Sequence, residues 1–270
     1  MNLSSKYPTV RLLGVDVFAL PMDTVLDIAN EHIANRERLL IGVVNVAKIV
    51  NMQKDPELRR SIKESDLVLA DGLPVVWLSR MLGKPLPERV AGIDIMYKLL
   101  QEANDKHYSV YFLGAKPEVL QKVVKTIRIN YPGIHIAGFR DGYYDKDEDQ
   151  SVAQDIKNSQ ADILFVAISP PKKEIFLRQW RNFMNVPVCH GVGGSFDVLA
   201  GVTIRAPLWM QKCGLEWLHR LIQEPQRMWR RYLITNAVFV KLSVIAILQA
   251  HFASFCRKCS RLSGSKSGTE

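Results

Sequence analysis

The chain has 270 residues, of which 47% are hydrophobic and 23% are charged, and its formal net charge is +9. This composition is typical of a globular protein, which excludes a largely disordered chain, and the length allows one large α/β domain with an appendage. The basic balance favours phosphates, a nucleic acid or an anionic membrane surface as ligands.

The first half of the chain alternates short apolar runs with helical stretches. Strands are expected at residues 10–20 (one strand or a pair), 39–44, 66–70 and 108–113. Helices are expected at residues 23–36 with Asp23 as cap, after Asn45, from Asp55-Pro56, at 75–82, at 93–106 and from Pro117.

The same alternation continues in the second half. Strands are expected at residues 134–139, 162–168 and 186–189, with a polar loop at 141–150 and a helix from about 171 to 183. Strands and helices at this spacing predict a Rossmann-like parallel sheet with helices on both faces. The first seven residues are polar, so no apolar signal core is expected.

Polar residues follow several of the predicted strands directly. They are Asn45, Asp71-Gly72, residues 114–116, residues 169–174 and residues 191–197. Ligands of open α/β sheets bind beyond the carboxyl ends of the strands, so these segments predict one polar cleft.

The segment 191–197 is the most informative of these. Three glycines, Gly191, Gly193 and Gly194, leave backbone amides open to a ligand, and Asp197 adds a carboxylate. Amides at a strand-to-helix turn form an anion cradle that suits a diphosphate. The alternative is a tight turn that only joins the strand to the helix.

The composition changes after residue 205. Tryptophans and arginines alternate up to residue 232, and Pro225 divides this stretch into two helices. The following stretch, to residue 255, is largely apolar and long enough to cross a bilayer, but Lys241 lies near its centre. We expect a helix in the membrane interface; the alternatives are packing on its own domain or on a second subunit.

These observations predict four parts. Residues 1–205 form the α/β core, 206–232 a basic and aromatic helical appendage that completes the site, 233–256 a membrane-associating apolar helix and 257–270 a disordered tail. The four cysteines include one close pair, Cys256 and Cys259, without a second pair or a histidine cluster. We therefore expect neither a metal site nor a disulfide framework, which fits a reducing cytoplasm.

Several ordered motifs between about residues 12 and 232 resemble the WecG/TagA/CpsF glycosyltransferases, glycosyltransferase family twenty-six. They are Ala-Asp-Gly-Leu-Pro-Val-Val-Trp at 70–77, Glu-Arg-Val-Ala-Gly-Ile-Asp at 88–94, Pro-Lys-Lys-Glu at 171–174, the glycine loop at 191–197, Arg-Ala-Pro at 205–207, and Gly-Leu-Glu-Trp at 214–217 through Arg231-Tyr232.

The resemblance implies an inverting glycosyltransferase that needs neither a metal nor another cofactor. Its donor would be a UDP-sugar: UDP-N-acetylmannosamine, its uronic acid or a related hexose. Its acceptor would be an undecaprenyl-diphosphate-linked sugar at the cytoplasmic face of the bacterial inner membrane. The product would serve teichoic-acid linkage units, enterobacterial common antigen, capsule or exopolysaccharide. An anionic membrane surface and a further copy of the chain would be its macromolecular partners.

The resemblance also implies roles for individual residues. Asp71 matches the proposed catalytic base, and a carboxylate there would take the proton of the acceptor hydroxyl; the alternative is an Asp-Gly turn. Asn45 matches an asparagine that either touches the donor sugar or caps a helix. Arg89 matches an arginine at the donor diphosphate; the alternative is a solvated loop arginine.

The other implied donor or diphosphate contacts come from the sheet edge and the appendage. They are Gly114, Lys173, Gly193, Gly194, Asp197, Arg220, Arg227 and Arg230. For the three appendage arginines the alternative is a basic surface that faces solvent or lipid headgroups, and for Asp197 it is a helix cap.

Two positions depart from the common family pattern. Val43 stands where the family often has threonine, and Lys173 stands where it often has glutamine. Because of the first change, the chain lacks a hydroxyl that would contact the donor or the acceptor, so the donor sugar need not be N-acetylmannosamine. The second adds a cation that suits an anionic donor.

Two other classes of protein fit parts of the pattern. A Rossmann-type dehydrogenase is disfavoured because no Gly-x-Gly-x-x-Gly opens the first strand–helix unit. A non-enzymatic membrane- or nucleic-acid-binding module would carry its basic and aromatic residues outside any cleft. Here they are confined to the appendage, beside the apolar helix, so no nucleic acid is expected as a partner.

Overall fold

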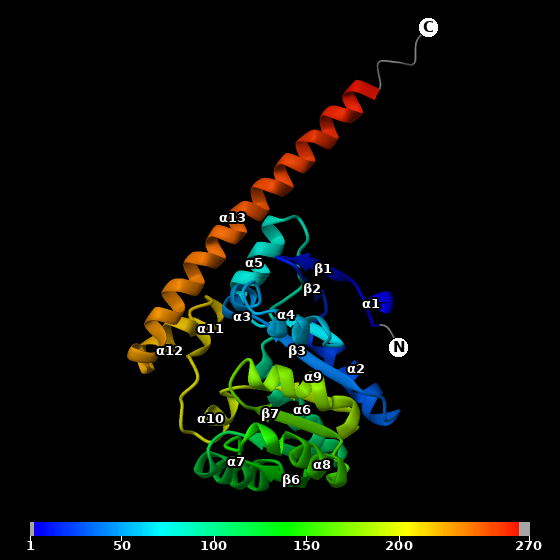
Figure 1. Ribbon diagram of the computed structural model, residues 1–270, viewed down its shortest axis with the longest axis vertical. Coiled ribbons are helices and arrows are strands. Elements are labelled where there is room, and N and C mark those ends of the chain that lie inside the picture. Colours follow the sequence, from blue (N-terminus) through cyan, green and yellow to red (C-terminus); the bar gives the residue numbers. More distant parts are fainter. Residues whose placement is uncertain (1–2, 265–270) are drawn as a thin grey trace.

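The computed structural model describes residues 3–264, with the side chains of Arg227 and residues 253–264 left out (Figure 1). Six parallel strands form one sheet in the order β4-β3-β8-β7-β5-β6. The strands are β3 (Leu39–Val44), β4 (Leu67–Ala70), β5 (Ser109–Gly114), β6 (His135–Arg140), β7 (Ile163–Ala167) and β8 (Val188–Gly191). The Rossmann-like parallel sheet predicted from the sequence is confirmed.

Helices follow the strands and cover both faces of the sheet. They are α1 (Leu3–Lys6), α2 (Met22–Ala34), α3 (Val46–Asn51), α4 (Pro56–Lys63), α5 (Leu73–Met81), α6 (Gly92–Lys106), α7 (Pro117–Asn130), α8 (Asp149–Ser159), α9 (Lys172–Met184) and α10 (Ser195–Leu199), with a 3-10 turn at Lys146–Glu148. The appendage adds α11 (Leu208–Lys212), α12 (Glu216–Gln223) and α13 (Pro225–Gly264).

The alternation of buried side chains along β3 shows how the core is divided. Leu39, Ile41 and Val43 join the apolar cluster that includes α2, α6 and α7 on one face. Leu40 and Val44 point to the other face, where α3, α4, α5, α8 and α9 pack. All five side chains are buried, which is the pattern of a strand inside a two-sided parallel sheet.

Residues 10–20 form a hairpin of β1 (Thr9–Leu12) and β2 (Val15–Phe18). Both turn residues, Leu13 and Gly14, have positive φ (46° and 89°), which matches the twist of a two-residue hairpin. The strand pair, one of two expected forms, is therefore the one observed.

Side-chain caps fix the starts of two helices, α3 and α4. The Asn45 side chain accepts a hydrogen bond from the amide of Lys48, and the Asp55 side chain accepts one from the amide of Leu58. The prediction that Asp23 caps the first long helix is wrong. The helix α2 begins at Met22, after Pro21, and the amide of Met22 donates a hydrogen bond to the side chain of Glu88.

The helix α8 was not predicted from the sequence. The stretch after residue 141 was expected to be a polar loop, but α8 begins at Asp149 within it. Only Val152, Ala153 and Ile156 supply its apolar face, so most of the helix reads as polar sequence.

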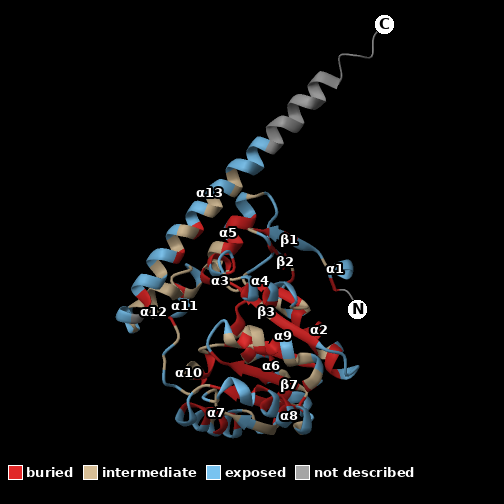
Figure 2. Ribbon diagram, in the orientation of Figure 1, coloured by how far each residue is buried: buried red, intermediate tan, exposed pale blue. Residues whose placement is uncertain are grey.

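The appendage contains one long helix where two parts were predicted. Pro225 opens α13, as expected, and the helix then continues without a break to Gly264, past the boundaries predicted at residues 232 and 256; residues 265–270 lie outside the described part. Its first half packs on α3, with Phe239 buried in the cluster around Val50. Figures 1 and 2 show the helix projecting beyond the body after this contact, with the residues from 248 to 252 exposed.

The aromatic centre of the larger core gives a stability test. Phe112 in β5 is fully buried against Phe165 and Phe196, with ring centroids 6.1 and 5.9 Å away. Phe112→Ala should lower the free energy of unfolding by about 3–5 kcal/mol, because it removes a core ring and leaves a cavity. Phe139→Ala, in edge strand β6 where the side chain is 38% exposed, is the control. Equal losses for both variants in urea unfolding would contradict this core assignment.

Candidate active site

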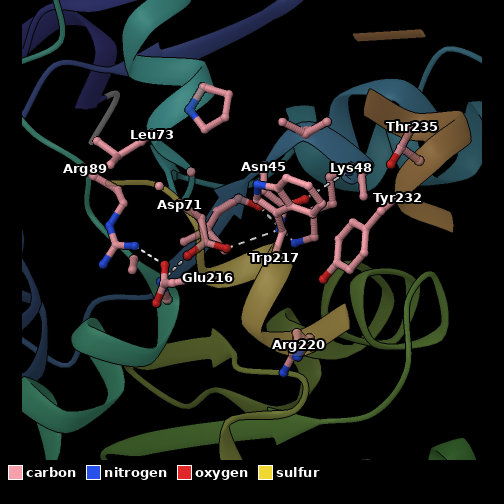
Figure 3. Close-up of a pocket in the computed structure, with 18 of the residues that line it drawn as sticks. Asn45, Lys48, Asp71, Leu73, Arg89, Glu216, Trp217, Arg220, Tyr232 and Thr235 are labelled. Atoms are coloured by element: carbon pink, nitrogen blue, oxygen red, sulfur yellow. Dashed lines mark hydrogen bonds and ion pairs between the residues drawn. The ribbon is translucent and has the colours of Figure 1, made fainter. Parts of the chain in front are cut away.

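A cavity of about 700 Å³ lies at the carboxyl edge of the sheet, between the core and the appendage. The ends of three neighbouring strands, β4, β3 and β8, supply its floor, and α5, α12 and α13 supply its walls. Seven of the predicted site residues line it: Asn45, Asp71, Arg89, Lys173, Gly193, Gly194 and Arg220. Figure 3 shows several of these side chains converging on one space.

Asp71, directly after β4, is held by two hydrogen bonds. Its Oδ1 accepts from the backbone amide of Gly92 at 2.9 Å, and its Oδ2 accepts from Nδ2 of Asn45 at 3.2 Å (Figure 3). A carboxylate has about four lone-pair sites, so these two bonds fix its orientation and leave acceptor capacity for a substrate hydroxyl. The geometry is that of an oriented, partly exposed base.

Asn45 does two things at once. Its Oδ1 caps α3 by accepting from the Lys48 amide at 3.1 Å, which turns the other side-chain atom, Nδ2, toward Asp71. The cap expected from the sequence is therefore confirmed, and it also orients the residue toward the predicted base. Contact with the donor sugar stays a prediction.

A buried histidine supports this arrangement from behind. His190 in β8 is fully buried; its Nε2 lies 2.9 Å from the carbonyl oxygen of Gly92, and its Nδ1 lies 3.1 Å from that of Ile41. Burial lowers the pKa of His190, and the hydrogen bonds to the carbonyl oxygens of Gly92 and Ile41 oppose that shift. His190 fixes the backbone at Gly92, whose amide in turn holds Asp71.

The glycine loop after β8 lies over the side chain of Lys173. A Cβ at Gly191 would come within 3.0 Å of Lys173 Cε, and one at Gly193, where φ is +54°, within 3.4 Å of its Nζ. The absence of side chains on these glycines lets the ammonium approach the loop closely. The loop and this buried cation together form a site with positive character.

Lys173 belongs to a buried charge triad. Glu174 Oε1 lies 2.9 Å from Lys48 Nζ and 3.2 Å from Lys173 Nζ. Burial lowers the pKa of Lys173 to about 8, helped by the charge of Lys48 and opposed by Glu174. Burial acts to raise the pKa of Glu174, but the two ammonium groups outweigh it and hold that pKa at about 2.

Two ammonium groups thus share Glu174 beneath the glycine loop, and the charge of Asp71 also acts on Lys173. Lys48 was not among the predicted site residues, although it lines the cavity. The sequence could have indicated Lys48 as a cavity residue, because it lies in the first turn of the helix that Asn45 caps at the cleft.

Arg89 lines the cavity, but its guanidinium takes part in ion pairs. Its Nη1 binds Glu216 of α12, and its Nη2 lies 3.4 Å from Asp94. Arg205 joins the cluster through Asp94 at 2.6 Å, and its buried Nη2 has no hydrogen-bond partner within the described residues. Arg205 lines the cavity, although this Nη2 atom is itself shielded from the open space, and the diphosphate role of Arg89 stays a prediction.

The appendage arginines are not equivalent. Arg220 on α12 reaches the glycine loop, since its Nη2 lies 3.0 Å from the position of a Cβ on Gly194. Arg230 does not line the cavity; it is exposed, with its guanidinium 6.0 Å from the ring of Trp229. Arg231, which was not predicted, lines the cavity instead, one position further along α13. The side chain of Arg227 lies outside the described part.

Two further predicted residues do not line the cavity. Gly114 ends β5, two strands away from β8, and its φ of +119° and the close approach of Ala167 (2.5 Å from an added Cβ) require glycine for backbone reasons. Asp197 is not a lining residue, although its Oδ2 lies 3.6 Å from the position of a Cβ on Gly194; its backbone carbonyl accepts from the amides of Val202 and Thr203.

The cavity also has an apolar wall that the sequence analysis did not identify. Trp77 and Met81 of α5 and Phe239, Val244 and Ile247 of α13 line this part of it. At the junction with the polar end, the rings of Trp217 and Tyr232 pack edge to face with centroids 5.8 Å apart. Among the side chains that the structure describes, no group of three or more His, Cys, Asp or Glu residues is arranged to hold a metal ion.

Known proteins share this sequence over most of its length. The glycosyl transferase WecG/TagA/CpsF family matches residues 10–252. The chain is 39% identical over 180 residues to the N-acetylglucosaminyldiphosphoundecaprenol N-acetyl-β-D-mannosaminyltransferase of Bacillus spizizenii, which covers 67% of this chain and 69% of the relative. It is 36% identical over 214 residues to the Bacillus subtilis enzyme of the same name, covering 78% and 82%. The chain therefore belongs to the WecG/TagA/CpsF family and is a glycosyltransferase.

Proposed function

We propose that the protein transfers an N-acetylhexosamine from a UDP-sugar, with inversion, to a sugar carried on undecaprenyl diphosphate. The observation that carries this proposal is Asp71, oriented by Asn45 and Gly92 in a cavity with cations at one end and an apolar wall at the other. A lipid-linked sugar diphosphate needs both kinds of surface.

The relatives suggest the identity of both substrates. Their names specify N-acetylglucosaminyldiphosphoundecaprenol as acceptor and N-acetylmannosamine as the transferred sugar. UDP-N-acetylmannosamine is the first donor to test here, with its uronic acid and related hexoses as alternatives. The cavity position of Val43, where the family often has threonine, keeps these alternatives open.

In the proposed mechanism, Asp71 takes the proton of the acceptor hydroxyl as that oxygen attacks the anomeric carbon. The bond between the anomeric carbon and the UDP oxygen breaks, and UDP leaves with the electron pair. Lys173 and Arg220, beside the glycine loop, stabilise the charge that develops on the diphosphate, together with Arg205, which lines the same cavity. Attack from the opposite side turns an α-linked donor into a β-linked product.

We further propose that the enzyme works at the cytoplasmic face of the bacterial inner membrane. Residues Met228–Phe252 of α13, with a mean hydropathy of 1.8, are long and apolar enough to cross a membrane, a conclusion from length and composition alone. Only 11% of that window is buried in the protein. An acceptor anchored in the bilayer supports the same location, and self-association stays a prediction.

Replacing the proposed base tests the mechanism. Asp71→Asn keeps the size of the side chain but removes its basicity, so kcat should fall by about 10²–10⁴-fold while UDP binding persists. Asp23→Asn, on the exposed side of α2, should leave turnover unchanged. Undiminished turnover of the Asp71 variant, measured as UDP release with donor and acceptor present, would refute the assignment.

The buried lysine predicts a pH dependence of UDP binding. With a pKa of about 8, Lys173 loses its charge as the pH rises from 7 to 9, so UDP should bind more weakly at pH 9. If UDP raises that pKa by one unit, the affinity falls at most about tenfold across the titration. Lys173→Gln should flatten the profile in calorimetry, whereas Lys172→Gln, which alters a lysine outside the cavity that binds the Tyr144 carbonyl, should preserve it. If UDP affinity changed with pH to the same extent in both variants, the pH dependence would not come from Lys173.

Metal independence is part of the proposal, because cationic side chains already surround the proposed diphosphate position. We expect sugar transfer at the same rate with EDTA as without it. A loss of turnover that added Mg²⁺ or Mn²⁺ restores would show that a metal ion takes part.

A further inference from the structure

The active-site cavity is continuous with a groove that leads away from the sheet. The same cavity contains Asp71 at its polar end and extends along α5, from Leu73 to Met81, and along the middle of α13. Trp77 and Met81 line this extension although they are 46% and 62% exposed. Large apolar side chains that stay exposed next to a catalytic cavity indicate a ligand with an apolar part.

One face of α13 forms the groove wall along its length. Its lining residues recur every three or four positions, which places them on one stripe of the helix: Tyr232, Asn236, Phe239, Ser243 and Ile247, with Val240 and Val244 beside them. From Tyr232 to Ile247 the stripe covers about 22 Å at 1.5 Å per residue. It starts at the polar end, next to Arg231, and becomes apolar with distance from Asp71.

The opposite face of α13 is also apolar but does not line the cavity. Ile245 and Leu248 are exposed there, and Lys241 is likewise outside the groove. A helix with one apolar face on a groove and another apolar face exposed suits a protein whose groove opens into lipid. A peptide partner would require hydrogen-bonding groups along this groove, and its apolar half offers few.

We propose that the groove between α5 and α13 binds the first isoprene units of the lipid-linked acceptor. This inference rests on the proposed function and adds the path of the lipid. The acceptor diphosphate lies at the junction, near Arg231 and His219, and the sugar points toward Asp71. The hydrocarbon then leaves along α13 into the membrane, so the helix is both an anchor and a wall of the substrate site.

Filling the groove tests this path. Val244→Trp places an indole in the groove, and Ile245→Trp places one on the neighbouring position of the outer face. The two substrates compared are the sugar diphosphate on a long polyprenyl chain and the same sugar diphosphate on a methyl group. Val244→Trp should raise KM for the polyprenyl acceptor by about tenfold and leave kcat/KM for the methyl acceptor unchanged. Ile245→Trp should change neither value.

The outcomes separate the two levels of the proposal. If the unmodified enzyme transfers sugar to neither acceptor while UDP still binds, the proposed function fails. If it is active and both tryptophan variants behave alike, the lipid path is wrong. Calorimetric UDP binding and vesicle flotation check that each variant remains folded and membrane-bound.

A photoreactive probe gives an independent readout. An acceptor with a diazirine on its second isoprene unit should label peptides from α5 and from the middle of α13. Labelling confined to the outer face of α13 or to α11 would overturn the proposed path.

Discussion

The site depends on one pair of hydrogen bonds, those from Asn45 and Gly92 to the carboxylate of Asp71. They join the ends of β3 and β4 to the start of α6, and His190 in β8 holds Gly92 in place from the core. Three neighbouring strands and one helix start therefore fix a single carboxylate. Because each partner is a backbone group or a side chain locked by a cap, the orientation of Asp71 is set before any substrate arrives.

A second constraint is electrostatic and works against stability. Burying Lys173 beside Lys48 places two cations close together; Glu174 pairs with both, and the charge of Asp71 also acts on Lys173. A buried charge is costly in a folded protein, which is why burial lowers the pKa of Lys173. Such a cost is understandable where a negatively charged ligand balances it, and the open glycine loop above Lys173 offers that ligand its amides.

The sequence predicted those features that depend on local chemistry. Continuous apolar runs located the strands, and Asn45 and Asp55 marked helix starts, since caps and buried parallel strands leave local patterns. The helix α8 was missed because only three apolar residues make up its buried face. Lys48, Glu216 and Arg231 were missed as cavity-lining residues because the cavity joins distant segments of the chain. Gly114 lies outside the cavity, and the backbone crowding at Ala167 gives a separate reason for glycine there.

In the proposed location, the continuity of α13 links the chemistry to the membrane. Since the helix runs without a break from Pro225, the residues beside the polar cavity and the apolar residues further along are parts of one rigid rod. The depth of the apolar segment in a bilayer would therefore also determine how far Arg231 and Tyr232 lie from the bilayer surface. Contact of α13 with α3 and the Trp217–Tyr232 ring pair transmit that height to the cavity. An enzyme whose acceptor is fixed at the headgroup level needs its base held at a matching height, and a continuous helix meets this need more simply than a hinged one.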